Sequence, residues 1–192
     1  MLNFRGRARR KAVARSLYEA VVARSREPAF YRELGVPDTV DGRFDMVALH
    51  AALVLRRLKA DRGRSADLAQ AFFDVMFVDM DENLRELGVG DLSVGRKVKD
   101  MIRAFYGRLA AYEAGLAGTE EELAAALRRN LYRGVAAEEA GLLTMAAYVR
   151  RQADALEALE VDRILGGELA FAPIPSLQQV SEGGTHAPVE PA

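Results

Sequence analysis

The sequence predicts an all-α protein, and three observations lead to that prediction. Ala, Leu and Arg, which favour helices, dominate the chain, whereas the β-branched residues that favour strands are scarce. No stretch alternates apolar and polar residues for long, as a half-buried strand would. Apolar residues instead recur with a spacing near 3.6 along most of the chain. We therefore expect a single-domain helical bundle of about six helices with a disordered C-terminal tail.

The N-terminal part should hold one long helix and one short one. The first helix is expected over residues 8–26, because apolar side chains there share one face and Pro28 follows its end. Residues 29–34 should make a single helical turn. Residues 36–42 contain proline and glycine and are expected to form a loop.

The next helix should be the buried centre of the fold. It is expected to begin at a cap on Asp41 or Gly42 and to reach about Ala60, and it is apolar on most sides. His50 lies within it. A lone histidine with no carboxylate or nucleophile fixed beside it is a poor general base, so we interpret it as a hydrogen-bonded core or groove residue.

Two helices rich in phenylalanine and methionine should follow. Gly63 is expected to break the chain, Ser65 to cap the first of these helices, and Gly88 to end it. Ser93 is expected to cap the second, which should reach about Ala114. Their apolar residues would pack the two helices against each other and against the central one.

The last helices have a clear start signal. Thr119 and Glu122 form the sequence pattern of a capping box, in which each side chain accepts a hydrogen bond from the other residue's backbone N–H group. One long final helix is then expected from about Ala137 to Leu165. Beyond it, Gly, Pro, Ser and Gln replace the periodic pattern. We expect three parts: a basic arm (1–26), a helical domain (27–165) and a flexible tail (166–192).

The charge of the chain is unevenly placed, although the net charge is only −1. No acidic residue precedes Tyr18, whereas the segment after Leu165 contains acidic residues and no Lys or Arg. A basic arm of this kind favours contact with an anionic membrane or with RNA. It is also typical of an organellar transit peptide. The candidate contact residues are Arg5, Arg7, Arg9, Arg10 and Lys11.

The residues include no recognisable catalytic apparatus. Cysteine is absent, which excludes disulfides, thiolate metal sites and cysteine nucleophiles. No glycine-rich phosphate-binding motif follows a strand, and no apolar run is long enough to span a bilayer. We therefore expect a protein that is not an enzyme and that needs no metal, no cofactor and no small-molecule substrate.

Two charged clusters remain to be interpreted. The acidic one could belong to a metal-binding helical enzyme, but the Glu-x-x-His pairs of such bundles do not occur, so we favour a solvated face or a docking surface. Its members are Asp74, Asp79, Asp81, Glu82 and Glu86. The basic one lies in the first turn of a helix, where the helix dipole disfavours cations, which suggests salt bridging or partner contact. Its members are Arg96, Lys97 and Lys99, next to Asp91.

Several short segments between about residues 26 and 151 resemble the ubiquinol–cytochrome c chaperone family, in its alphaproteobacterial form. They include Glu27-Pro-Ala-Phe-Tyr31, Leu34-Gly-Val-Pro-Asp-Thr39, Asp41-Gly-Arg-Phe-Asp45, Asp91-Leu-Ser-Val-Gly-Arg-Lys-Val-Lys99 and Phe105-Tyr-Gly107.

This resemblance implies an all-helical assembly factor that binds newly made cytochrome b and promotes biogenesis of the cytochrome bc1 complex. It further implies a cytoplasmic location, peripheral to the cytoplasmic face of the inner membrane, with the ribosome as a possible additional partner. The rival hypothesis is an arginine-rich regulator associated with the ribosome or RNA. A chaperone needs an apolar surface with a charged rim. Our candidate partner-binding residues, whose apolar members could equally be ordinary core, are Phe72, Phe73, Met76, Phe77, Asp79, Asp81, Asp91, Arg96, Lys97 and Lys99.

Overall fold

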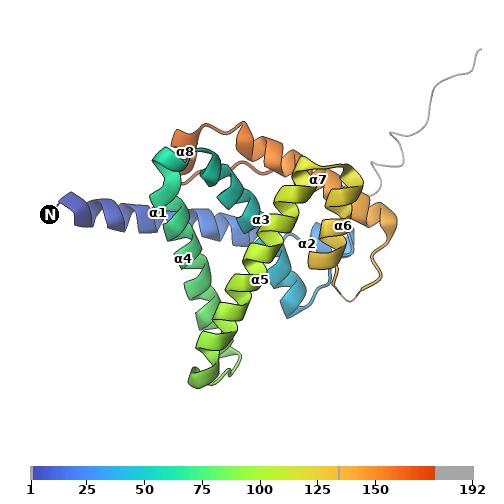
Figure 1. Ribbon diagram of the computed structural model, residues 1–192, viewed down its shortest axis with the longest axis horizontal. Helices are drawn as coiled ribbons and strands as arrows, with labels where there is room; N and C mark the ends of the chain where they lie inside the picture. Colours follow the sequence, from blue (N-terminus) through green and yellow to red (C-terminus); the bar gives the residue numbers. More distant parts are fainter. Residues whose placement is uncertain (1, 134, 176–192) are drawn as a thin grey trace, which may run out of the picture.

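The computed structural model describes residues 2–133 and 135–175, and within these ranges the protein has eight helices and no strand (Figure 1). The all-α prediction is confirmed. The greater part of the expected tail, residues 176–192, lies outside the described residues. The helices are α1 Leu2–Ser25, α2 Pro28–Arg32, α3 Val40–Ala60, α4 Arg62–Glu86, α5 Asp91–Ala117, α6 Glu120–Asn130, α7 Glu139–Glu157 and α8 Val161–Leu165.

Helix α3 is the buried centre, as its sequence predicts. Every residue from Asp45 to Val54 is buried, and the helix packs against α1, α4, α5 and α7. Because α3 is surrounded, it has no polar face except near its two ends. Each fully buried Leu, Val or Met contributes about 1.5–3 kcal/mol relative to an exposed one, so this helix accounts for a large share of the core.

The N-cap of α3 lies two or three residues earlier than predicted. Thr39, and not Asp41 or Gly42, is the N-cap, and its Oγ1 accepts a hydrogen bond from the Gly42 N–H group at 3.1 Å. Gly42 has a different role. A Cβ atom at this position would lie 2.0 Å from the carbonyl oxygen of Pro37, so the preceding loop can approach the helix this closely only at a glycine.

The connection between α3 and α4 also differs from the prediction. Helix α4 begins at Arg62, and Gly63 lies inside its first turn without breaking it. Ser65 is buried and does not cap the helix, because its hydroxyl group donates to the carbonyl oxygens of Leu58 and, at 2.9 Å, Asp61. It thereby stabilises the tight turn. Ser93 is likewise not a cap, since α5 begins at Asp91 with Gly90 as its N-cap.

The expected capping box is present. The Glu122 N–H group donates to Thr119 Oγ1 at 3.3 Å, and the Thr119 N–H group donates to Glu122 Oε2 at 2.8 Å. The expected last helix, by contrast, is divided into α7 and α8. Buried Arg57 on α3 donates to the carbonyl oxygens of Leu156 and Leu159, both at 2.9 Å. These bonds give both carbonyl groups a side-chain donor at the point where the helix breaks.

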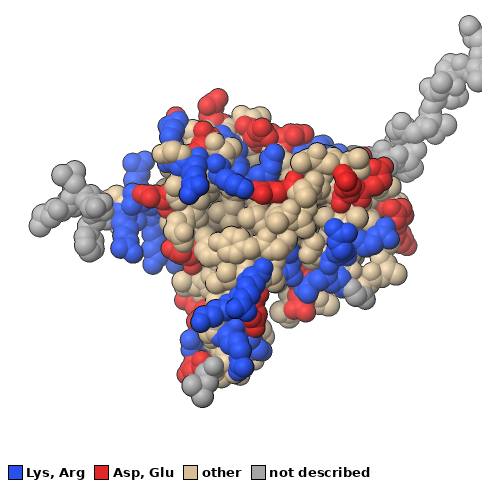
Figure 2. All heavy atoms as spheres, in the orientation of Figure 1, with Lys and Arg blue, Asp and Glu red and all other residues tan. Residues whose placement is uncertain are grey.

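Two parts of the molecule project from the bundle (Figure 1). One is the beginning of α1, and the other is the hairpin made by α4 and α5, whose turn contains Gly88 at φ 80°. Only the beginning of α1 is an arm, because Ala14, Leu17 and Val21 are fully buried in the core. The basic side chains of the arm are visible at the N-terminal end in Figure 2.

The first residues after α8 are held against the bundle. Gln152 on α7 donates to the Ala170 carbonyl oxygen at 2.8 Å and accepts from the Ala172 N–H group at 2.8 Å. Arg24 on α1 donates to the Ala172 carbonyl oxygen. Residues 166–175, assigned to the tail from their composition, therefore run along α1 and α7 in this structure.

Candidate functional site

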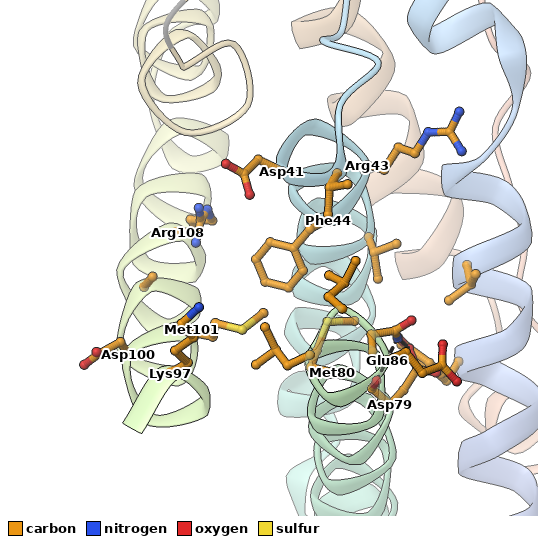
Figure 3. A pocket seen from close by; sticks show the side chains of 18 of the residues that line it. Asp41, Arg43, Phe44, Asp79, Met80, Glu86, Lys97, Asp100, Met101 and Arg108 are labelled. Carbon is orange, nitrogen blue, oxygen red and sulfur yellow. Dashed lines mark hydrogen bonds between the residues drawn. The ribbon is translucent and has the colours of Figure 1, made fainter. Parts of the chain in front are cut away.

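A groove opens between α1, the first half of α3 and the projecting α4–α5 hairpin. Its volume is about 870 Å³, within the usual range for binding pockets. Figure 3 shows Phe44 of α3, Met80 of α4 and Met101 of α5 pointing into the same space. The apolar side chains that line it are Val22, Val40, Phe44, Val47, Met80, Leu84, Leu87, Met101 and Ala104.

The groove arises because the apolar residues of α4 keep their helical spacing beyond the part of the helix that is packed in the core. Met80 and Leu84 on α4 and Leu87, the residue just after its end, are four and three residues apart, so they share one face. The same face is packed against other helices earlier in α4, but near the hairpin turn no helix covers it. Leu87 is accordingly 64% exposed, whereas Met80, closer to the core, is 8% exposed. The apolar stripe is therefore core at one end and open surface at the other.

Charged side chains line the rim of the groove. Asp79 accepts a hydrogen bond from the Tyr18 hydroxyl group at 2.7 Å and another from Asn83 at 3.1 Å. Burial, together with the hydrogen bond and the charge of Asp79, raises the pKa of Tyr18, which keeps the phenol protonated as a donor. Arg43 is paired at 2.6 Å with Asp38 outside the groove. The rim thus combines both signs of charge around an apolar floor (Figure 3).

A buried ion cluster closes one end of the groove. Asp45 on α3 has a side chain only 2% exposed, and Arg108 on α5 and Arg133 after α6 both contact it. Arg133 donates to Asp45 Oδ2 through Nε at 3.0 Å and Nη2 at 2.8 Å. Burial raises the pKa of Asp45, and the two guanidinium groups oppose that shift. The cluster joins three elements at the point where α3 enters the bundle.

Arg108 is incompletely paired within this cluster. Its side chain is 7% exposed, its Nη2 lies 2.8 Å from Asp45 Oδ1, and its guanidinium group lies 5.7 Å from the Phe44 ring centre. Among the described residues, four buried polar atoms of this cluster and its surroundings have no hydrogen-bond partner: Arg108 Nε and Nη1, Asp45 Oδ1 and the Tyr112 hydroxyl oxygen. An unpaired polar group destabilises the folded state most where water is excluded, so these buried N–H groups without an acceptor need an explanation.

The aromatic and methionine residues proposed as a partner surface lie mostly inside the bundle. Phe72 and Met76 are fully buried, and Phe77 is 7% exposed. Phe73 is half-buried and packs on Phe77 at 4.6 Å between ring centres. None of these side chains lines the groove. The structure thus places Phe72, Met76 and Phe77 in the core, where a partner cannot reach them without a rearrangement of the helices.

The charged residues proposed from the sequence are divided between groove and solvent. Asp79 and Lys97 line the groove. Arg85 pairs with Asp81 at 2.7 Å and also with Asp91, so those two carboxylates form an ion-pair network at the hairpin turn. Because α5 begins at Asp91, the basic cluster lies beyond the first turn, in which it was expected, and its other two members, Arg96 and Lys99, are exposed outside the groove.

In the basic arm, the side chains of Arg7, Arg9 and Lys11 are exposed, and Arg10 lies 3.4 Å from Asp67 on α4. The side chain of Arg5 lies outside the described part of the chain. The arm therefore presents at least three cations to solvent on one projecting helix.

His50 is a hydrogen-bonded core residue, as interpreted from the sequence. Its Nδ1 lies 3.0 Å from both Ser25 Oγ and the Met46 carbonyl oxygen, and its Nε2 lies 2.8 Å from the Tyr148 hydroxyl group. Ser25 is fully buried and also donates to the Val21 carbonyl oxygen. No substrate can reach this serine and histidine, so the pair does not constitute a nucleophile and its base.

Two further searches of the described residues concern metals and membranes. In residues 2–133 and 135–175, no group of three or more His, Cys, Asp or Glu side chains is arranged to hold a metal ion. Over the same residues, none of the helices combines the length and the apolar character needed to cross a bilayer.

The sequence interpretation missed the groove-lining residues Phe44, Met101, Arg108 and Arg133, and it missed Asp45, which pairs with the two arginines. One signal for the ion cluster was present, because an aspartate at position 45 stands in a helix that is otherwise apolar, and a buried carboxylate needs a cationic partner. The identity of that partner depends on the tertiary fold.

Comparison with known proteins gives consistent matches. The profile of the family described as ubiquinol-cytochrome C chaperone matches residues 32–171. The crystal structure of the Cbp3 homolog from Brucella abortus is 36% identical, with a TM-score of 0.80, over 90% of this chain and 96% of that one.

Animal relatives match over a smaller share of their own length. Ubiquinol-cytochrome-c reductase complex assembly factor 1 of Xenopus laevis is 26% identical, covering 85% of this chain and 82% of the relative. The Homo sapiens protein of that name is 25% identical, covering 93% of this chain and 60% of the relative. The chain thus spans about three fifths of the human protein.

Proposed function

The chain belongs to the ubiquinol–cytochrome c chaperone family, and on that premise we propose that it is a non-catalytic chaperone for newly made cytochrome b. In this proposal it binds an apolar segment of cytochrome b before the other subunits of the bc1 complex do, and it releases that segment during assembly. The animal relatives are named as assembly factors of the same complex, which supports this role.

The observation that carries the proposal is the groove between α1, α3 and the α4–α5 hairpin. A newly made membrane protein exposes apolar helices that must be kept from aggregating, and an open apolar recess with a charged rim suits such a helix. Methionine side chains such as Met80 and Met101 are flexible and adapt to different partner shapes.

The expected binding energy suits a chaperone that must also let go. Three or four partner side chains in the groove would contribute roughly 1.5–3 kcal/mol each. Association itself costs several kcal/mol, so the net affinity should be micromolar at the tightest. Moderate affinity allows the client to leave when its permanent partners arrive.

A pull-down with matched variants tests the proposal. Leu87 lines the groove and is 64% exposed, whereas Val78 on α4 is 53% exposed and does not line it. Neither substitution, Leu87→Asp or Val78→Asp, should disturb the core. We expect cytochrome b to copurify from detergent-treated membranes with the wild type and with Val78→Asp, and to be strongly reduced with Leu87→Asp. Equal recovery with all three proteins would refute the role of the groove.

We further propose that the basic arm holds the protein at the cytoplasmic face of the inner membrane. Arg7, Arg9 and Lys11 are exposed on the projecting part of α1, and each cation near an anionic surface contributes on the order of 1 kcal/mol. Replacing these three by glutamine leaves the buried part of α1 intact. We expect the variant to sediment much less with anionic vesicles than the wild type does. Neither protein should sediment with neutral vesicles.

Binding to the ribosome or to RNA through the same arm is the second candidate function. The specific observation is again the exposed cations on one projecting helix. A salt titration of RNA binding by the wild type and the same triple variant separates the two. A steep salt dependence that the variant loses would favour RNA, whereas weak binding by both proteins would favour the membrane.

A further inference from the structure

We propose that the client segment held in the groove carries an acidic side chain, and that Arg108 is the residue that binds its carboxylate. This inference rests on the proposed function, because it specifies the chemistry of the segment that the groove accepts. It follows from the burial of Arg108, from its unpaired N–H groups and from the charge of the cluster around it.

The first observation is that Arg108 is buried without being fully paired. Its side chain is 7% exposed, and within the described residues its Nε and Nη1 have no hydrogen-bond partner. Buried guanidinium groups normally use their donors, because each unpaired donor loses its hydration without compensation. An arginine held in this state at the wall of a groove is poised to bind an acceptor that arrives with a ligand.

The second observation is the charge of the cluster. One carboxylate, Asp45, is shared by two guanidinium groups, Arg108 and Arg133, so the cluster carries one positive charge in excess. Asp41 lies nearby on the rim and opposes this excess, but it is exposed, as is almost half of the Arg133 side chain, so water screens both charges and leaves the buried Arg108 as the main cation. The end of the groove therefore favours an anionic group over a neutral one.

The third observation is the position of Arg108 along the groove. Lys97, Met101, Ala104 and Arg108 succeed one another on the face of α5 that lines it. A helix lying in the groove would contact Met101 and Phe44 with apolar side chains and reach Arg108 next to them (Figure 3). The occupant that fits both features is an apolar helix with one Asp or Glu on the face that enters the groove.

This choice also agrees with the physical needs of a membrane protein. A carboxylate within an apolar segment is costly to bury in lipid and is therefore a vulnerable point before assembly. An arginine in a partly dry groove offers charge-assisted hydrogen bonds, which are about twice as strong as neutral ones. Arg108 would thus shield the carboxylate while the apolar side chains of the groove shield the remainder of the segment.

The test uses the full chain and two fluorescent synthetic peptides. Both peptides form the same apolar amphipathic helix, and they differ only in having Glu or Gln at the centre of the apolar face. Fluorescence anisotropy gives the dissociation constant of each. We expect the wild type to bind the Glu peptide about tenfold more tightly than the Gln peptide, which corresponds to about 1.4 kcal/mol.

Two protein variants identify the arginine responsible. Arg108→Met removes the charge but keeps an unbranched side chain in the groove. Arg103→Met is the matched control, because Arg103 lies on the same helix with a side chain 79% exposed and paired with Asp100. We expect the preference for Glu to disappear in Arg108→Met and to persist in Arg103→Met, with circular dichroism confirming that both variants are helical.

Each other outcome overturns a defined part of the account. Equal binding of the two peptides by the wild type, as expected if solvent satisfies the Arg108 N–H groups, overturns the inference and leaves the proposed function standing. Loss of the preference in Arg103→Met overturns the assignment to Arg108. Binding of neither peptide would contradict the proposed function itself. The peptide comparison on the wild type remains decisive even if Arg108→Met is unstable.

Discussion

The protein should lose stability as the pH falls from about 7 to about 4.5. Replacing His50 by glutamine should abolish much of that pH-dependent loss. Burial lowers the pKa of His50 from 6.5 to about 4, and nearby Arg24 acts in the same direction. The ring is enclosed by Phe30 and Tyr148, whose ring centres lie 5.5 Å and 5.8 Å away, so a charge on it would have little access to water.

The sign and size of the effect follow from these pKa values. Between pH 6.5 and about pH 4 the unfolded chain binds a proton on His50 and the folded protein does not, so the folded state loses stability as the pH falls. A shift of one pKa unit corresponds to about 1.4 kcal/mol. The full shift is therefore worth roughly 3 kcal/mol, of which about 2 kcal/mol should be lost by about pH 4.5.

Urea denaturation followed by circular dichroism, repeated at several pH values, measures this loss. Carboxylates also titrate on the acidic side of this range, so the informative quantity is the difference between the pH profiles of the wild type and His50→Gln. The matched control is His186→Gln, which replaces the only other histidine of the chain. We expect the control to follow the wild type. Parallel profiles for the wild type and His50→Gln would refute this reasoning.

Four further substitutions make three tests of the local structure, each by its effect on the free energy of unfolding. Gly42→Ala should cost at least about 2 kcal/mol, because its Cβ would meet the Pro37 carbonyl oxygen at 2.0 Å. Gly63→Ala, with open space around it, should be neutral or stabilise the protein by up to about 1 kcal/mol. Thr119→Ala should cost about 1 kcal/mol through loss of the capping box. Arg57→Met should cost about 2–4 kcal/mol and increase hydrogen exchange around the α7–α8 break, since two carbonyl groups lose their buried donor. The prediction for the glycines would be contradicted if Gly63→Ala were as unstable as Gly42→Ala. The other two predictions would be contradicted if Thr119→Ala or Arg57→Met left the free energy of unfolding unchanged.

The sequence predicted the features that depend on local pattern. The apolar character of residues 44–58 identified the buried helix, and the Thr119 and Glu122 pair identified the start of α6. The resemblance to the ubiquinol–cytochrome c chaperone family is confirmed by the match over residues 32–171. These features are decided by neighbouring residues, so they can be recognised without the tertiary structure.

The features that the sequence did not predict depend on distant residues. Ser65 is a residue type that often caps helices, yet its hydroxyl group donates to carbonyl oxygens at the end of α3. The last long helix is broken where Arg57, about a hundred residues earlier, supplies donors to its carbonyl groups. The Ser65 bonds reach back four and seven residues across the turn between α3 and α4, and the Arg57 side chain comes from a different part of the chain, so neither is visible in the pattern of a single helix.

The groove shows the same limitation most clearly. On α4, Phe72, Met76, Met80 and Leu84 are indistinguishable by residue type and spacing. The first two are core because other helices cover that half of α4, and the last two line the groove because the hairpin extends beyond the bundle. The sequence therefore predicted an apolar stripe but not which end of it is open.

The most direct test of the central claim is site-specific photocrosslinking in cells that assemble the bc1 complex. A photoreactive amino acid at position 87, within the groove, should crosslink to cytochrome b, whereas the same amino acid at position 78, on α4 but outside the groove, should not. Crosslinks to cytochrome b from Val78 alone, or from neither position while the protein still supports assembly, would contradict the assignment of the client to the groove.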